Sequence, residues 1–245
     1  MENVIARTSD ETTEVVIWNN ASTDGTRAYL DGLIDPRITV VDHDRNIGLQ
    51  AYARAFALTT ADHLVELDDD IIDAPKHWDK TLLEAYERLP QVGYLAANLV
   101  NNPHDVTARI MYRTSAHLYR IEEVNGVRLK LGPVGGGCTM TSRELYHRVG
   151  GFRPKRRSIF WQEDAAYISA LAKLGYGAAY LEELRVLHAG GGYYSKPAPA
   201  KTAFWNAYHR AATRRRKLKH FLVRVPLVRR LNERFRLFEA PGKRS

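Results

Sequence analysis

The sequence has little of what a secreted or membrane-spanning protein requires. Cys138 is the only cysteine among 245 residues, which excludes an internal disulfide and fits a reducing compartment. No apolar run approaches the roughly 18 residues of a membrane-spanning helix, although 44% of the residues are hydrophobic. The start, Met1-Glu2-Asn3, also lacks the basic residues and apolar run of a signal peptide. We therefore expect a cytoplasmic protein, long enough for a domain with a sizeable core.

A short apolar strand ends in three consecutive carboxylates, and this is the most informative stretch of the chain. Residues 64–67 read Leu-Val-Glu-Leu and are followed by Asp68, Asp69 and Asp70. Adjacent carboxylates repel one another and burial would raise their pKa values, so a bound cation explains the arrangement. Hard oxygen ligands select Mg2+ or Mn2+, and Mg2+ is usually held together with substrate phosphates. The alternative is an acidic turn that caps the helix predicted to begin near Pro75.

Short apolar strands alternate with helical segments as far as Asp70. The predicted strands are residues 14–18, 38–41 and 64–67, and the predicted helices begin at Arg27 and span about residues 49–58. This alternation is typical of an α/β fold with a parallel sheet, whose ligands bind at the carboxyl ends of the strands. One polar cluster, beginning at Asn19, follows the first strand, and the Asp cluster follows the third. Both clusters therefore fall at the same edge of the predicted sheet.

These landmarks resemble those of the family-two glycosyltransferases with the GT-A fold, and the resemblance extends from Val15 to about Arg216. In chain order they are Asn19-Asn20-Ala21-Ser22-Thr23-Asp24-Gly25-Thr26, the turn Arg45-Asn46-Ile47-Gly48, Asp68-x-Asp70, Trp161-Gln162-Glu163-Asp164, and His188. Each motif alone is a weak signal for this family, but the whole set in this order is specific. The resemblance implies a single Rossmann-like GT-A domain over residues 1–208, with a mostly parallel central sheet.

The resemblance implies that a sugar is transferred from a nucleotide-diphosphate donor. That reaction needs a cation on the leaving phosphates and a base for the incoming hydroxyl group. By resemblance, Asp70 and His188 would ligate Mn2+ or Mg2+, and Asp164 would be the catalytic base. Asp68 would lie against the ribose or reach the metal through water. A single displacement of this kind inverts the anomeric configuration.

The resemblance also implies contacts to the rest of the donor and to the acceptor. Asn19 and Asn46 would join Asp68 in binding the donor. Glycine lets the backbone approach a ligand closely, and an indole ring can stack on a sugar. The predicted pocket for the donor sugar or the acceptor consists of Gly136, Gly137, Trp161 and Glu163.

Each of these residues also has a structural alternative. Glu163 and Asp164 would stabilise the first turn of a helix without any catalytic role. His188 could be an ordinary histidine at a strand end, and the glycines near Gly136 could form a plain loop. Trp161 could be a core residue or a hydrophobic staple before the helix.

Two features depart from the family pattern. The family's first strand normally precedes the region where this chain starts, and Met1 to Thr13 has room only for the end of a helix and a loop. The sequence therefore predicts a sheet that lacks this strand, which exposes backbone groups unless another segment pairs there. Asn19 stands where many relatives have an Asp that contacts the nucleotide base and the ribose. The Asn19 side chain can still form hydrogen bonds there, but it carries no charge.

Positive charge is concentrated in residues 209–245. This tail holds 13 Lys and Arg against two Glu, whereas residues 1–208 hold 23 basic and 26 acidic residues. The residues Leu227, Val228, Leu231, Phe235 and Phe238 fall on one predicted helical face, with Arg229, Arg230, Arg234 and Arg236 mostly opposite. A basic amphipathic helix over residues 214–238 suits an anionic membrane surface. A polyanionic partner and a helix packed on the preceding domain are the alternatives.

The sequence as a whole predicts a metal-dependent, inverting glycosyltransferase in glycan, glycolipid or surface polysaccharide synthesis. Its partners would be a nucleotide-sugar donor and a glycan or lipid-linked acceptor, with no nucleic acid, on the inner face of the membrane. A sugar nucleotidyltransferase is disfavoured because no glycine-rich phosphate loop bearing Lys or Arg lies near the start. A non-catalytic protein that binds nucleotide sugars or polyanions is the alternative from a different class.

Overall fold

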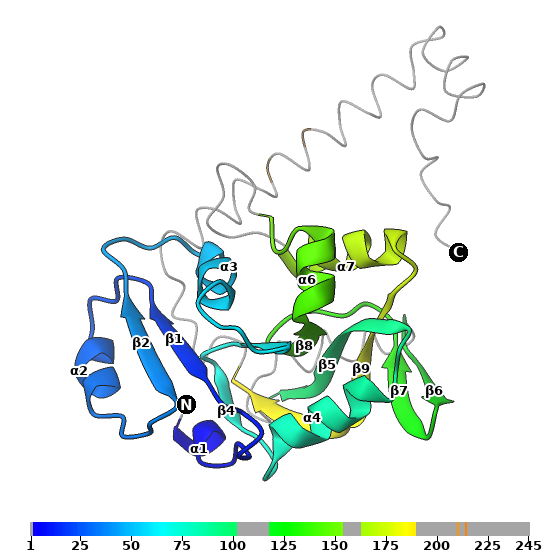
Figure 1. Ribbon diagram of the computed structural model, residues 1–245, viewed down its shortest axis with the longest axis horizontal. Helices are drawn as coiled ribbons and strands as arrows, with labels where there is room; N and C mark the ends of the chain where they lie inside the picture. Colours follow the sequence, from blue (N-terminus) through cyan, green and yellow to red (C-terminus); the bar gives the residue numbers. More distant parts are fainter. Residues whose placement is uncertain (1, 102–117, 154–162, 190–209, 211–213, 215–245) are drawn as a thin grey trace, which may run out of the picture. The chain divides into compact units, whose positions relative to one another are not determined.

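The computed structural model describes residues 2–101, 118–153, 163–189, 210 and 214 (Figure 1). Its contacts divide the chain into Met1–Lys196 and Pro197–Ser245, and the fold below is that of the first unit. The helices are α1 (Glu2–Ile5), α2 (Thr26–Asp31), α3 (Gln50–Phe56), α4 (Trp78–Glu87), α6 (Arg143–Val149) and α7 (Glu163–Lys173). The strands are β1 (Val15–Asn19), β2 (Ile38–Asp42), β3 (His63–Leu67), β4 (Ile71–Asp73), β5 (Val92–Asn101), β6 (Arg120–Val124), β7 (Val127–Leu131), β8 (Cys138–Ser142) and β9 (Gly177–His188).

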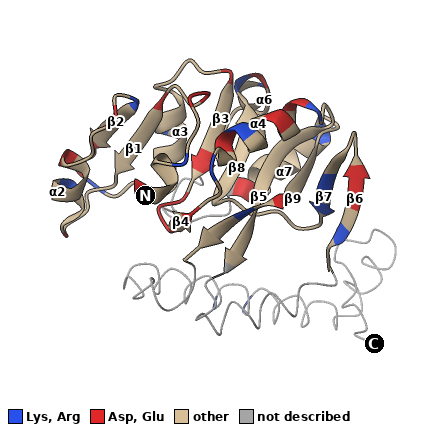
Figure 2. Ribbon diagram, turned by 90° about the horizontal axis from the view of Figure 1, so that it is seen from below, with Lys and Arg blue, Asp and Glu red and all other residues tan. Residues whose placement is uncertain are grey.

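Seven of the described strands form one sheet. Its order is β3-β8-β5-β9-β7-β6, and β4 pairs with β9 beside this path (Figure 2). The α/β class is confirmed, but the sheet is mixed rather than mostly parallel. Within it, β5–β9 is the parallel pair and the other pairings are antiparallel. The reason is that strand–helix alternation ends at β5, after which β6 and β7 form a hairpin and β8 runs back between β3 and β5.

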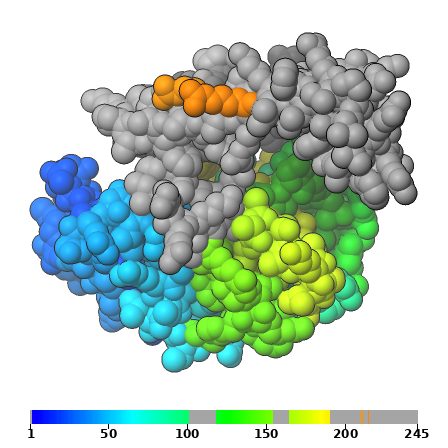
Figure 3. Space-filling view, turned by 90° about the horizontal axis from the view of Figure 1, so that it is seen from above, coloured from blue at the N-terminus to red at the C-terminus, as the bar shows by residue number. Residues whose placement is uncertain are grey.

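Apolar clusters pack on both faces of this sheet. On one face α4 contributes Trp78, Leu82 and Tyr86. On the other face, α6 and α7 lie side by side, as the green and yellow surfaces in Figure 3 show, and their cluster includes Tyr146, Tyr167 and Leu171. Full burial of each large apolar side chain stabilises the fold by about 1.5–3 kcal/mol. The seven-stranded sheet is therefore a rigid support for groups at its edges.

The strands β1 and β2 form a separate parallel sheet. Val15 pairs with Ile38 and Asn19 with Asp42, and no described strand joins this pair to β3. Figure 2 shows β1 and β3 following one another across the unit with no strand between them. Among the described strands, β1 and β2 therefore pair only with each other.

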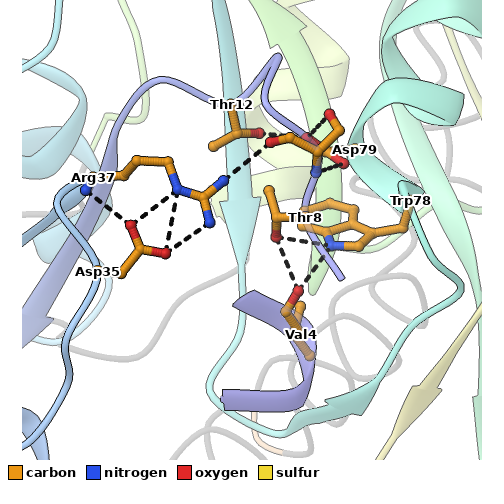
Figure 4. A network of polar contacts seen from close by, with 8 residues as sticks. Val4, Thr8, Thr12, Asp35, Arg37, Trp78 and Asp79 are labelled. Carbon is orange, nitrogen blue, oxygen red and sulfur yellow. Dashed lines mark hydrogen bonds and ion pairs between the residues drawn. The ribbon is translucent and has the colours of Figure 1, made fainter. Parts of the chain in front are cut away.

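A polar network fixes the segment between α1 and β1 (Figure 4). The carboxylate of Asp79 accepts hydrogen bonds from the Ser9 backbone N–H at 2.9 Å, the Ser9 hydroxyl at 2.7 Å and the Thr12 hydroxyl at 2.6 Å. Burial alone would raise the pKa of Asp79, but these hydrogen bonds outweigh it and leave the pKa below its ordinary value. Arg37 donates to the Ser9 carbonyl at 3.0 Å. The network therefore connects α4 to the loop that leads into β2.

Candidate functional site

The Asp cluster lies where β3 meets the short strand β4. The Asp68 backbone N–H donates to the Gly137 carbonyl at 2.8 Å, which ties the end of β3 to the loop before β8. The strand β4 then pairs with the end of β9, so that Ile71 lies opposite His188. The Ala189 N–H donates to the Asp70 carbonyl at 2.7 Å. This pairing brings Asp70 and His188 together from distant parts of the chain.

Asp70 and His188 form a pair beside which one carboxylate oxygen lacks a hydrogen-bond partner in the described residues. The Nε2 atom of His188 lies 3.1 Å from Oδ2 of Asp70, and both side chains are partly exposed. The other oxygen, Oδ1, is buried and has no hydrogen-bond partner in the described part of the chain. Among these residues, no group of three or more His, Cys, Asp or Glu could hold a metal ion. One carboxylate and one imidazole fit a divalent ion whose remaining ligands are phosphate oxygens and water.

Asp68 is held by a tyrosine of α3. The Tyr52 hydroxyl donates to Oδ1 of Asp68 and also contacts the Leu67 carbonyl at 3.2 Å. Burial raises the pKa of Asp68, and the Tyr52 hydrogen bond opposes this effect. The neighbouring Asp69 is exposed. The structure thus separates the three carboxylates into a partly buried one held by Tyr52, an exposed one, and one paired with His188.

Asp164 sits in the first turn of α7 and faces the glycine loop. Its Oδ2 accepts from the Gly136 N–H at 3.1 Å, and its Oδ1 accepts from the Ala165 N–H at 2.6 Å. Gly137, which follows Gly136, has a φ of +110°, and this conformation disfavours any residue other than glycine. Because the Gly137 carbonyl holds Asp68, the dipeptide Gly136–Gly137 connects two of the predicted site carboxylates.

A third carboxylate, missed in the sequence analysis, lies under this loop. Glu66 is 2% exposed, and its Oε2 accepts from the Tyr94 hydroxyl at 3.0 Å and contacts the Thr139 hydroxyl at 3.4 Å. A Cβ atom at Gly136 would lie 2.9 Å from Oε1 of Glu66, so any other residue there would require the Glu66 carboxylate to shift. The available signal was the alternation of β3, in which Glu66 shares the buried phase with Leu64.

Of the predicted donor residues, Asn19 is the last residue of β1, and Asn46 lies in the turn that follows β2. Asn19 is buried, donates to Asp42 at 2.8 Å and accepts from the Ser22 N–H at 3.1 Å. Asn46 is exposed and accepts from the Gly48 N–H at 2.8 Å. Within the described residues, the hydrogen bonds of these two side chains are with Asp42, Ser22 and Gly48, and none is with Asp68 or Asp164.

The remaining predictions are only partly covered. Trp161 and the tail over residues 214–238, apart from Arg214, lie outside the described residues. Glu163 begins α7, but its side chain is also outside them. In the described ranges, no helix is both long enough and apolar enough to cross a membrane.

Comparison with known proteins gives a family and a fold. Residues 1–150 match the protein family described as Glycosyl transferase family 2. Among solved structures, the chain is similar to the mannosyltransferase PcManGT from Pyrobaculum calidifontis in complex with GDP-Man and Mn2+, with 23% identity and a TM-score of 0.52. It is also similar to GalNAc-T7 with UDP, GalNAc and Mn2+, with 16% identity and a TM-score of 0.57. A third similar structure is S. aureus TarS 1-349 in complex with UDP-GlcNAc, with 14% identity and a TM-score of 0.52.

These likenesses cover most of this chain but only part of the other proteins. They include 80%, 77% and 80% of this chain, and 53%, 40% and 56% of the respective structures. The chain therefore spans about half the length of the structures that it matches. A comparison with curated protein sequences gives no match.

Proposed function

The chain belongs to glycosyl transferase family 2, and from this premise we propose that it is a metal-dependent, inverting transferase. The donor would be a nucleotide-diphosphate sugar, and the acceptor hydroxyl would belong to a glycan or lipid-linked glycan. Three structural relatives carry a nucleotide or nucleotide sugar, and two of them carry Mn2+ as well. These ligands support a nucleotide-sugar donor and a divalent ion for this chain.

The observation that carries the proposal is the unpartnered oxygen Oδ1 of Asp70 beside the Asp70–His188 pair. A buried carboxylate oxygen without a partner is costly in an apolar site, and a cation would offset that cost. Asp70 and His188 would hold Mn2+ or Mg2+, which when bound neutralises charge on the leaving diphosphate. Asp68, with its raised pKa and its Tyr52 hydrogen bond, would face the ribose of the donor.

Asp164 would remove the proton from the acceptor hydroxyl. Its two oxygens accept from the N–H groups of Gly136 and Ala165, which fix the direction of the carboxylate. The acceptor oxygen then forms a bond to the anomeric carbon while the bond from that carbon to the diphosphate oxygen breaks. The proton goes to Asp164 and the electron pair leaves with the diphosphate. One displacement from the opposite face inverts the anomeric configuration.

The two ends of the donor would lie on different parts of the fold. Asn19 and Asn46 would contact the nucleoside, and Gly136 and Gly137 would line the sugar or acceptor pocket together with Trp161 and Glu163. Such a transferase would act in the synthesis of glycans, glycolipids or surface polysaccharide.

The basic tail extends the proposal to a location. Residues 1–208 carry more acidic than basic groups, so attraction to anionic lipid would come from residues 214–238 and hold the enzyme peripherally on the cytoplasmic face. The full-length chain should sediment with anionic but not neutral vesicles, and less so in high salt. Replacement of Arg229, Arg230 and Arg234 by Gln should weaken this binding. Equal binding by that variant would remove the tail from the proposal.

Release of nucleotide diphosphate from a panel of UDP- and GDP-sugars tests the enzymatic proposal. Release should require Mn2+ or Mg2+, stop in EDTA, and fall in Asp70→Ala but not in Asp69→Ala, the adjacent exposed carboxylate. NMR of the first transferred product should show the inverted anomer. Metal-independent release, or equal effects of the two substitutions, would contradict the metal assignment.

A further inference from the structure

We infer that the sheet face beside Asp164 carries a subsite for an anionic group of the acceptor, formed by Lys130, Tyr119 and Tyr180. This inference rests on the proposed function, because it names the chemical class of acceptor that Asp164 would deprotonate. It adds a group of residues that the sequence analysis did not single out.

One row of paired residues crosses the sheet from a buried carboxylate to a buried ammonium group. In the strand registers, Glu66 lies opposite Thr139, Thr139 opposite Ala96, Ala96 opposite Tyr180, and Tyr180 opposite Lys130. Paired residues on neighbouring strands point to the same face and are about 4.8 Å apart across each pair of strands. Glu66 on β3 and Lys130 on β7 are therefore opposite charges at the two ends of one row, whose strands Figure 2 shows in this order.

The glycine loop and Asp164 lie over the middle of this row. Gly136 lies above Glu66 and donates to Asp164. The preceding N–H, that of Gly135, donates to the Tyr180 hydroxyl at 3.0 Å. Burial raises the pKa of Tyr180, which keeps its hydroxyl neutral near pH 7, and Asp164 adds to this effect. The proposed base, Asp164, thus lies between the negative charge of Glu66 on the β3 side and the positive charge of Lys130 on the β7 side, beyond Tyr180.

Lys130 is held in place by aromatic rings. Its Nζ lies 4.5 Å from the ring centroid of Tyr119 and 5.5 Å from that of Tyr180, and it donates to Oδ1 of Asn98 at 3.3 Å. The Tyr119 hydroxyl donates to the Pro133 carbonyl at 2.8 Å, so the same aromatic pair also positions the loop beside Asp164. Lys130 is 9% exposed, and a charge in such a low-dielectric position acts more strongly than one in water.

This arrangement favours one class of acceptor. Both tyrosine rings are partly exposed and offer apolar faces on which a sugar ring can stack. An acceptor carboxylate or phosphate would be repelled at the Glu66 end of the row and attracted at the Lys130 end. The acceptor is therefore a sugar that bears an acidic group, oriented so that its reactive hydroxyl lies over Asp164.

Arg128 provides a matched control on the same strand. It lies two residues before Lys130, so it shares the same face, but it is exposed and lies 3.8 Å from the Glu182 carboxylate. Removal of either residue takes one positive charge from β7. An effect of net charge alone would therefore be the same for Lys130→Met and Arg128→Met.

The test measures, by saturation-transfer NMR on the full chain, the affinities of methyl glucuronide and methyl glucoside, which differ in the acidic group. The wild type should bind the glucuronide about tenfold more tightly, as expected for one hydrogen bond to a charged group. Glucose 6-phosphate compared with glucose distinguishes phosphate from carboxylate as the preferred group. Lys130→Met should abolish the preference, whereas Lys130→Arg and Arg128→Met should keep it.

A second variant covers the case in which Lys130→Met fails to fold. Asn98→Asp is nearly isosteric and places a carboxylate beside Nζ of Lys130, so it should also abolish the preference. No preference in the wild type, or a preference that survives Lys130→Met or Asn98→Asp, would overturn the inference. If nucleotide sugars are turned over and the preference is absent, only this inference fails. If no nucleotide sugar is bound or turned over, the proposed function fails as well.

Discussion

The two sheets of the first unit differ in how they are held together. The seven-stranded sheet is packed on both faces, and residues such as Leu95 and Val186 are fully buried within it. In β1 only Asn19 is buried, and in β2 no residue is. The described contacts of the small sheet with its surroundings include the hydrogen bonds of Arg37 with Ser9 and of Asn20 with Gly48, and α3 packs beside β1.

This difference matches the division of labour in the proposed mechanism. The groups assigned to chemistry, which are Asp70, His188 and Asp164, are attached to the well-packed sheet or to the helix that covers it. The groups assigned to the nucleoside are Asn19, at the end of the weakly packed β1, and Asn46, in the turn after β2. We therefore expect the residues assigned to the chemical step to be held rigidly. The residues assigned to the donor lie in a part of the fold that should unfold locally more easily.

The largest expected effect is on the chemical step. Asp164→Asn keeps the size of the side chain but removes its capacity to accept a proton, so transfer should fall by about 10^2 to 10^4. Donor affinity should be unchanged. The rate is measured as release of nucleotide diphosphate from the donor, or as product formation when an acceptor is known. Glu144→Gln, in the first turn of α6, is the matched control for a helix-start effect and should leave the rate intact; equal rates for both variants would make Asp164 a helix-start residue only.

The next effect is on stability and distinguishes the two sheets directly. Leu95→Ala in β5 should lower the free energy of unfolding by about 2–5 kcal/mol, because it leaves a cavity in the core. Ile17→Ala in β1, whose side chain is only partly buried, should cost about 1 kcal/mol. Denaturant unfolding of both variants gives the two values. Equal losses would mean that the small sheet is packed as firmly as the large one.

A smaller effect is expected at the polar junction between the sheets. Asp79→Asn replaces an acceptor of three hydrogen bonds and should cost about 1–3 kcal/mol at neutral pH. Because the pKa of Asp79 is lowered by folding, its contribution is present above the unfolded value of about 3.9 and is lost as the pH falls through the folded pKa. Unfolding curves from pH 7 to pH 2 should show a larger loss of stability in the wild type than in Asp79→Asn, in which only the other carboxylates, such as Asp35, still titrate. The exposed Asp62→Asn should behave as the wild type does.

The sequence was most informative about candidate site residues whose position depends on their own segment of the chain. The Asp cluster follows a strand, and Asp164 opens a helix, so local pattern and family resemblance placed both. The mixed sheet was not predicted because it depends on β8, which pairs antiparallel with both β3 and β5 although it is distant from them in the chain. The β6–β7 hairpin does have a local signal, the Asn125-Gly126 turn with positive φ at both residues.

The row from Glu66 to Lys130 could not be predicted from local pattern. Its five residues come from five strands, and their alignment depends on registers that form only when distant segments pair. A shift of one residue in any pairing would move a side chain to the opposite face. The contact between Gly136 and Asp164 likewise depends on how α7 lies over the sheet.

Calorimetry of UDP and GDP binding, with and without Mn2+, tests the central claim most directly. The wild type should bind one of the nucleotides tightly only when Mn2+ is present, because in the proposed site Asp70 and His188 would hold the ion that faces the diphosphate. Asp70→Ala should lose this Mn2+-dependent gain in affinity, while Asp69→Ala should retain it. Unchanged, metal-independent affinity in Asp70→Ala would contradict the claim that this pair is the metal site of a glycosyltransferase.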